Sequence, residues 1–168
     1  MTSPHLASAI DAVYLGGQVG NVALTGDLGN AFSNAIGFGV DLGLRTNSLL
    51  DVTAHFQHSS HSGGTDGMSL NDLFLSADVH LLQVNDFDFA LAFGPGFYFF
   101  NAAAAGNLPS LSHTNFGLNF GALGDVVVSD NFRIGLDGRY HAVFGNIFGN
   151  TGGAFWTIML RAGVLFEI

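Results

Sequence analysis

An alternation of large apolar and small polar residues runs through most of the chain. Between positions 35 and 56 the even positions are mostly large and apolar, while the odd positions are glycine, polar or charged, apart from a polar break at 46–48. Successive side chains of a strand point to opposite faces, so this pattern predicts a two-stranded hairpin with one strongly apolar face. A soluble sheet would bury its large residues. Here the small, charged face has the composition of an enclosed surface, which is typical of strands whose apolar face contacts lipid.

The same alternation continues to the end of the chain and predicts about eight strands. The expected strands are 10–20, 35–45, 50–57, 72–81, 87–99, 116–128, 132–144 and 156–168. In the first strand, placing Tyr14 and Gln18 inside leaves Asp11 on the lipid side. A bulge near Ala12 would remove that conflict, because an extra residue in the strand turns the side chains before it to the opposite face.

Short and long connections alternate between these strands. The expected short turns are 46–48, 83–86 and 129–131, and the expected loops are 21–33, 58–68, 101–114 and 145–152. Strict alternation requires an even number of strands, an up-and-down order, and both termini on the short-turn side. The expected fold is therefore all-β: a single domain, 1–168, forming a transmembrane antiparallel barrel whose strands have about 9–11 residues each.

Composition agrees with this fold and excludes others. Only 10% of the 168 residues are charged and the mean hydropathy is +0.40, yet no stretch reaches the roughly 18 uninterrupted apolar residues of a spanning helix. A closed barrel is then the remaining way to satisfy backbone groups in lipid. Cysteine is absent, which excludes disulfides and thiolate metal sites, and the net charge of −9 argues against nucleic-acid binding. No basic segment followed by an apolar one opens the chain, so we expect that any export signal has been removed.

Charge is concentrated on the small-residue face. Random placement would put about half of the charges on each face, because the side-chain period of a strand is 2. Instead all four arginines and many aspartates fall on the small-residue face of their strands. They define the predicted lumen charge network: Asp41, Arg45, Asp51, Asp78, Asp88, Asp125, Arg133, Asp137, Arg139 and Arg161. Within it, Asp51 is expected diagonal to Arg45 and Asp41, and Asp125 is expected near Arg133 across the 129–131 turn.

A soluble barrel with the large residues inside is the main structural alternative. An eight-stranded barrel has an interior that side chains just fill, and the apolar face of this chain carries too many phenylalanines and leucines for that space. The opposite face, rich in glycine, alanine, serine and aspartate, has the appropriate volume. Packing therefore favours the membrane barrel.

The chain resembles the small bacterial outer-membrane barrels, such as the OmpA transmembrane domain, OmpX and OmpW. The resemblance covers essentially the whole chain and rests on the alternating strands, the motif Gly94-Pro95-Gly96-Phe97-Tyr98-Phe99 and the alternating last strand. It implies a bacterial outer-membrane location, insertion by an assembly machine, and outer-membrane lipid and lipopolysaccharide as partners; a monomer is expected. The usual terminal phenylalanine is replaced by Phe166-Glu167-Ile168, a departure from the family. The resemblance implies no single activity.

Two interpretations concern the lumen. The favoured one is a non-enzymatic barrel with a mostly closed polar lumen and a structural or surface-interaction role, because enclosed charges must pair and barrels of this size fill with side chains. The alternative is a narrow cation-preferring channel, in which the same carboxylates select ions that pass in water.

A third interpretation is a lipid A-modifying enzyme. The segment His58-Ser59-Ser60 is similar to the His-x-Ser pair of outer-membrane lipid A deacylases, in which the histidine activates the serine. Even parity puts His58 and Ser60 outside, near the loop end. No acidic residue that could orient the histidine is evident, because Glu167, the one glutamate, lies at the far end. No catalytic residue is therefore assigned.

His55, His58 and His61 are spaced three residues apart, which suggests a metal site. On a strand, however, His58 faces away from His55 and His61, and these two would lie about 20 Å apart at a rise of about 3.3 Å per residue. We therefore expect no metal and no cofactor.

Overall fold

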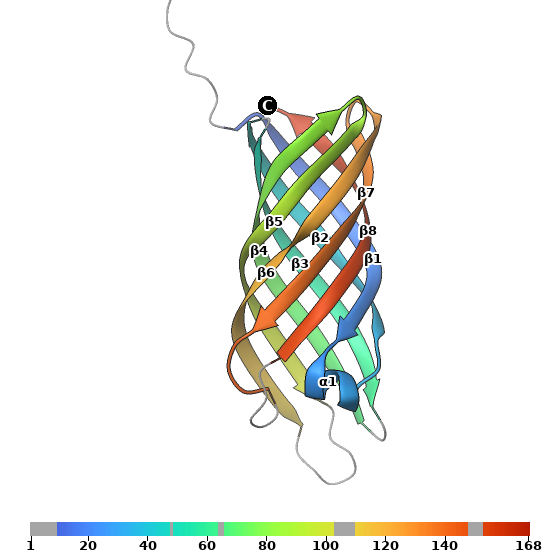
Figure 1. Cartoon of the computed structure of the whole chain (residues 1–168), viewed down its shortest axis with the longest axis vertical. Helices are drawn as coiled ribbons and strands as arrows, with labels where there is room; N and C mark the ends of the chain where they lie inside the picture. The colour runs from blue at the N-terminus through green and yellow to red at the C-terminus, as the bar shows by residue number, and fades with distance from the viewer. Residues whose placement is uncertain (1–9, 48, 64–65, 103–109, 148–152) are drawn as a thin grey trace, which may run out of the picture.

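The computed structural model describes residues 10–47, 49–63, 66–102, 110–147 and 153–168, which form a closed barrel of eight antiparallel strands in chain order (Figure 1). The strands are β1 (Ala12–Leu24), β2 (Ala35–Asn47), β3 (Leu50–Gly63), β4 (Asp66–Val84), β5 (Phe87–Ala102), β6 (Leu111–Ser129), β7 (Phe132–Val143) and β8 (Gly153–Glu167). Pairing of β1 with β8 closes the sheet. The predicted all-β, up-and-down barrel is confirmed.

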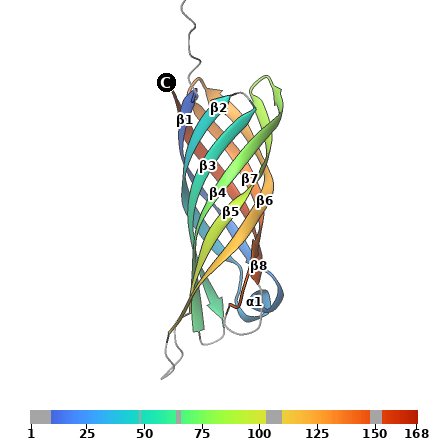
Figure 2. The ribbon, with the colours of Figure 1, turned by 90° about the vertical axis from the view of Figure 1, so that its left-hand side faces the viewer.

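The first and last described residues, Ile10 and Ile168, and the short turns lie at one end of the barrel, called here the short-turn end. There the Ile168 N–H donates to the Asp11 carbonyl at 3.2 Å. At the opposite, loop end, the six-residue helix α1 (Gly26–Ala31) contacts β1 and β8 (Figures 1 and 2). Among the described residues, no helix is long and apolar enough to cross a membrane.

The short turns are tight because the strands pair almost to their ends. Val84 pairs with Phe87 and Ser129 with Phe132, so two residues make each of these turns. Asn85 has φ of +52°, in the left-handed region that asparagine tolerates better than most residues. The register shifts beside all three short turns, as expected for bulges at a barrel rim.

The strands are longer than predicted, with 12 to 19 residues in place of about 9–11. The predicted loop 21–33 contains the end of β1 and all of α1, and the predicted loop 58–68 contains the ends of β3 and β4. The predicted loop 101–114 loses residues at both sides to β5 and β6; positions 103–109 and 148–152 lie outside the described residues. The reason is physical: toward the loop end much of the outer face becomes polar and much of the inner face becomes apolar, so the pattern of apolar-out and polar-in residues ends before the hydrogen-bonded ladder does.

The bulge expected near Ala12 is wrong. β1 pairs without a register shift with both of its neighbours, beginning at Ala12. Asp11 precedes the strand, is exposed, and donates its N–H to the Arg45 carbonyl at 2.8 Å. Because Asp11 stands at the rim, outside the strand, it needs no bulge to avoid the apolar face. Tyr14 and Gln18 point inward as predicted.

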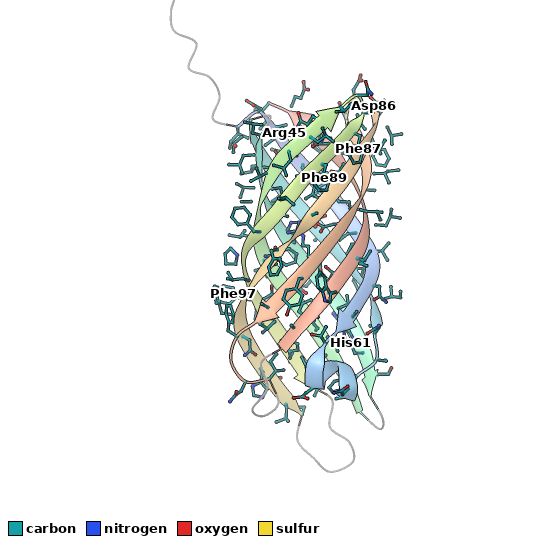
Figure 3. All side chains as sticks on the ribbon, viewed as in Figure 1. Arg45, His61, Asp86, Phe87, Phe89 and Phe97 are labelled. Atoms are coloured by element: carbon teal, nitrogen blue, oxygen red, sulfur yellow. The ribbon has the colours of Figure 1, made fainter. Side chains whose placement is uncertain are left out.

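The outer wall is apolar and the interior holds the charges. Phe38 is 59% exposed and Trp156 is 50% exposed, whereas Arg139 is 0% exposed. On the wall, neighbouring rings pack edge to face or tilted, as in Phe97 with Phe116, and Phe97 is seen on the outside in Figure 3. This distribution is the reverse of a soluble protein and requires apolar surroundings.

Small residues on the inner face make room for larger side chains that lie along it. Gly16 pairs with Gly163 across the β1–β8 seam, and a Cβ at either position would collide with the Tyr14 phenol. The ring therefore lies flat against the wall, where the Arg161 guanidinium stacks over it at 4.9 Å.

Candidate functional site

The structure places every residue of the predicted charge network in the barrel interior. They do not form one continuous network. They divide into a mouth cluster at the short-turn end, which is Arg45, Asp51, Asp88 and Arg133 together with His80, a central cluster around Arg139, and the pair Asp125–Arg161. Figure 3 shows Arg45 at the short-turn end and His61 at the loop end.

The mouth cluster pairs two carboxylates with three bases. Arg45 donates two hydrogen bonds of 3.0 Å to Asp51 in a bidentate arrangement. His80 lies between the two carboxylates: its Nδ1 is 2.7 Å from Asp88 and its Nε2 is 3.1 Å from Asp51. Arg133 contacts Asp88 at 3.2 Å. Arg45 also lies 3.7 Å from Asp88. Asp51 therefore has two basic partners and Asp88 has three, and such pairing is what enclosed charges require.

One of the two predicted positions differs in the structure. Asp51 lies directly opposite Arg45 rather than diagonal to it, because strand pairing continues to Asn47 and Leu50, with a bulge between Arg45 and Asn47. Asp125 lies near Arg133 as predicted, since both line the same small cavity and Arg133 is opposite Val127, two residues along β6 from Asp125. The ion pair of Arg133, however, is with Asp88 on β5.

Arg139 is the centre of the second cluster. Its guanidinium donates to Asp137 at 2.8 Å, to Ser76 at 2.9 Å and to Asn119 at 3.0 Å. It also lies over the Phe74 ring, 5.2 Å from the centroid. These partners come from β4, β6 and β7, so one buried side chain connects strands on different sides of the lumen.

His55 extends this cluster to β1 and β2. Its Nδ1 is 2.7 Å from Asp41, and its Nε2 is 3.4 Å from an Arg139 nitrogen. Since a carboxylate accepts and a guanidinium donates, the neutral tautomer with the proton on Nδ1 satisfies both contacts. Gln18 donates to the same Asp41 oxygen at 2.9 Å.

Several members of these clusters were absent from the predicted network, which counted only arginine and aspartate. Gln18, His55, His80 and Asn119 have the inward parity of their strands, and that parity was the signal that could have found them.

The lumen at the loop end is apolar, which the expectation of a polar lumen did not anticipate. A cluster of buried residues fills it: Val22, Leu24, Leu28, Met68, Leu70, Tyr98, Phe100, Val143, Ile147, Phe155 and Met159. Leu28 belongs to α1, so the helix adds a side chain to this cluster. Inward parity would have found most of the others if the strands had been extended to their real ends.

Little space remains around the pair Asp125–Arg161. The cavity lined by Tyr14, Arg45, Asp125 and Arg161, among others, measures about 20 Å³. That volume holds about one water molecule.

The outer wall carries the serine–histidine pair singled out in the sequence. His58 and Ser60 point outward as predicted, and the His58 Nε2 is 3.2 Å from the Ser60 hydroxyl. The other ring nitrogen, Nδ1, is 2.7 Å from Asn71 Oδ1, on the adjacent strand β4. Asn71 is therefore the residue that orients the imidazole, with an amide oxygen in the place where the sequence predicts a carboxylate to be needed.

The histidines at positions 55, 58 and 61 do not converge. His55 and His61 are buried inside the barrel, whereas His58 lies on the outer wall. Within the part of the chain that the structure describes, no group of three histidine, cysteine, aspartate or glutamate residues is arranged to hold a metal ion.

No protein-family model and no curated protein matches the chain. Solved structures do match. Neisserial surface protein A has a TM-score of 0.74 at 16% identity, covering 94% of this chain and 99% of that one. Ail, the attachment invasion locus protein of Yersinia pestis, has a TM-score of 0.64 at 16% identity, covering 94% and 99%. The N-terminal β-barrel domain of Pseudomonas aeruginosa OprF has a TM-score of 0.63 at 14% identity, covering 94% and 98%.

At these identities the likeness concerns the fold. Strand number, strand order and nearly complete coverage of both chains agree with the closed barrel described above. The chain therefore has the fold of the small eight-stranded β-barrels of bacterial outer membranes.

Proposed function

We propose that this protein is an integral barrel of the bacterial outer membrane with a closed lumen, and that its role is structural or carried by its outer surface. The apolar outer wall and the outer-membrane character of its structural relatives support the location. Outer-membrane lipid and lipopolysaccharide are then its surroundings. Closure of β1 on β8 leaves no free sheet edge to pair with another chain, which supports a monomer.

The observation that carries the closed lumen is the environment of Arg139. An aqueous path needs its charged groups to stay hydrated, and selectivity from charged rings arises only if water passes them. Arg139 is 0% exposed, and its donors are taken up by Asp137, Ser76 and Asn119. Beyond it, the apolar cluster fills the loop end. The charged groups therefore hold the barrel together rather than line a pore.

Single-channel recording of the refolded protein in planar bilayers tests this. We expect little or no steady conductance from the wild-type barrel. Arg139→Ala should open a cation-preferring leak, because it removes bulk and leaves the Asp78 and Asp137 carboxylates without their arginine. Asp130→Asn, at an exposed turn, is the matched control and should stay closed. Steady, cation-selective openings of the wild-type protein would replace this proposal with the channel.

A further inference from the structure

The contacts of His58 form a relay on the outer wall. The Ser60 hydroxyl can donate to His58 Nε2, 3.2 Å away, and His58 Nδ1–H can donate to Asn71 Oδ1, 2.7 Å away. One neutral imidazole tautomer satisfies both contacts. A nucleophile bonded to a base, with that base oriented by a third group, is the arrangement that activates a serine for attack on a carbonyl. Asn71 is directly opposite His58 in the β3–β4 register, so backbone pairing fixes its position.

The relay lies where the outer wall changes from apolar to polar. One row of outward residues across β3 to β6 is entirely apolar: Phe56, Leu73, Phe97 and Phe116. Two residues further toward the loop end, the row begins with His58 and Asn71. Two residues beyond that, the row is entirely polar: Ser60, Ser69, Asn101 and Ser112. At about 3.3 Å per residue, this transition takes roughly 13 Å along the strands.

The position of the relay at this boundary matches where the ester bonds of acyl lipids lie in a bilayer. Phe38 packs against His58, with ring centroids 5.2 Å apart, and an open groove of about 460 Å³ adjoins Ser60, Ser69 and Ser112 on the polar side. A bilayer places its acyl chains against apolar wall and its polar headgroups beyond it, so the ester bonds of acyl lipids lie at the boundary between them.

We propose that Ser60, His58 and Asn71 form an ester-hydrolysing site for acyl lipids in the leaflet at the loop end. The lipid substrate rests on the membrane placement proposed above; the relay itself does not. Ser60 and His58 are the catalytic residues, and Asn71 is a positioning residue that holds the imidazole tautomer.

The reaction balances with water as the second substrate. Ser60 Oγ attacks the ester carbonyl carbon while its proton passes to His58 Nε2. The bond between the carbonyl carbon and the alcohol oxygen then breaks, and His58 gives the proton to that oxygen. Water next attacks the acyl group on Ser60, again through His58, and releases a fatty acid and the free serine. The net change is ester plus water to acid plus alcohol.

The same strand provides an internal comparison. Ser59 and His61 also contact each other, at 2.9 Å, but both are buried inside the barrel, and the second ring nitrogen of His61 meets the Ser33 backbone carbonyl. The pair Ser59–His61 faces the lumen, away from lipid, whereas the pair His58–Ser60 faces outward, because alternate residues of a strand point to opposite faces.

Three substrates test the site, with the refolded protein checked for its barrel by heat-dependent gel mobility. The probes are a p-nitrophenyl acyl ester in detergent, phosphatidylethanolamine vesicles, and vesicles containing lipopolysaccharide, with fatty-acid release measured by mass spectrometry. Hydrolysis of the detergent ester supports the relay independently of membrane placement, and the two vesicle types distinguish the lipid class. Ser60→Ala and His58→Ala should each lower the rate by about 100-fold or more. Ser62→Ala, two residues along the same face, is the matched control and should retain the rate.

Asn71 has its own test. Asn71→Ala should lower kcat/KM about 10-fold or more, since the imidazole loses its orienting acceptor, and Asn71→Asp should restore it. Asn71→Asp should also move the acidic limb of the pH profile of kcat/KM, because a carboxylate stabilises the imidazolium; a merely structural asparagine would move neither. A folded wild-type barrel that hydrolyses none of the three substrates, or whose Ser60→Ala variant is equally active, would overturn the proposal.

Discussion

Arg139 shows at the scale of a single residue how this barrel keeps a charge inside. Burial of an arginine is costly unless its donors are satisfied and a counter-charge is near. Asp137 provides the counter-charge and accepts from Nε, and Ser76 and Asn119 both accept from Nη1. Removing the arginine would leave the carboxylates of Asp137 and Asp78 enclosed without it.

We therefore expect Arg139→Ala to lower the free energy of unfolding by about 3–5 kcal/mol, the usual effect of stranding one partner of a buried pair. Asp130→Ala, at an exposed turn, should change it by less than about 0.5 kcal/mol. Urea midpoints of both variants in lipid vesicles give the comparison. Equal midpoints would mean that Arg139 is not stabilising the barrel.

At the scale of elements, the backbone pairing of β4 with β5 has a gap in its middle. The ladder skips the positions between the pairs Phe74–Gly96 and Ala77–Phe93 without a change of register, and Pro95, which lies there, has no N–H to donate. Asn119, reaching across from β6, donates instead to the carbonyls of Leu75 at 3.2 Å and Gly94 at 2.8 Å. The Asn119 side-chain carbonyl accepts from Arg139. The same side chain therefore supports the β4–β5 ladder and belongs to the central cluster.

Asn119→Ala should therefore loosen the β4–β5 seam. Stranding buried carbonyls costs about 1–3 kcal/mol, and we expect a lower urea midpoint of that size with faster hydrogen exchange in the middle of β4 and β5. Asn21→Ala, on the exposed face of β1, is the control. If exchange in β4 and β5 were unchanged in the Asn119 variant, the side chain would not be supporting the ladder.

At the scale of the whole molecule, the two ends of the barrel differ. The short-turn end has tight connections, both described chain ends and the mouth cluster, whereas the loop end has α1 and the apolar cluster. Barrels of the outer membrane keep short turns in the periplasm and longer loops outside the cell. The relay at Ser60, near the loop end, would then face the outer leaflet.

Because the chain has no cysteine, single substitutions can report this orientation. Asp27→Cys lies on exposed α1, and Asp130→Cys lies in an exposed short turn. In intact cells a membrane-impermeant maleimide should label the first and not the second, and both after the outer membrane is permeabilised. The reverse pattern would contradict the orientation.

The sequence alone determined which face of each strand is enclosed. Side-chain direction alternates with every residue of a strand, so parity is a local property that needs no knowledge of neighbours. It was enough to predict the barrel, the inward position of Arg139 and its fellow charges, and the outward position of His58 and Ser60. The alternation of short and long connections likewise determined that the chain ends share one side.

Only the tertiary structure decided which residues meet. Arg133 forms its ion pair with Asp88, which lies two strands away on β5, and Asn71 reaches His58 because of the β3–β4 register. The real ends of the strands were hidden for a related reason: hydropathy records the surroundings of a side chain, whereas a strand ends where its backbone hydrogen bonds end. Which side chains meet across the lumen depends on the register between strands and on how the barrel closes, and the sequence of a single strand determines neither.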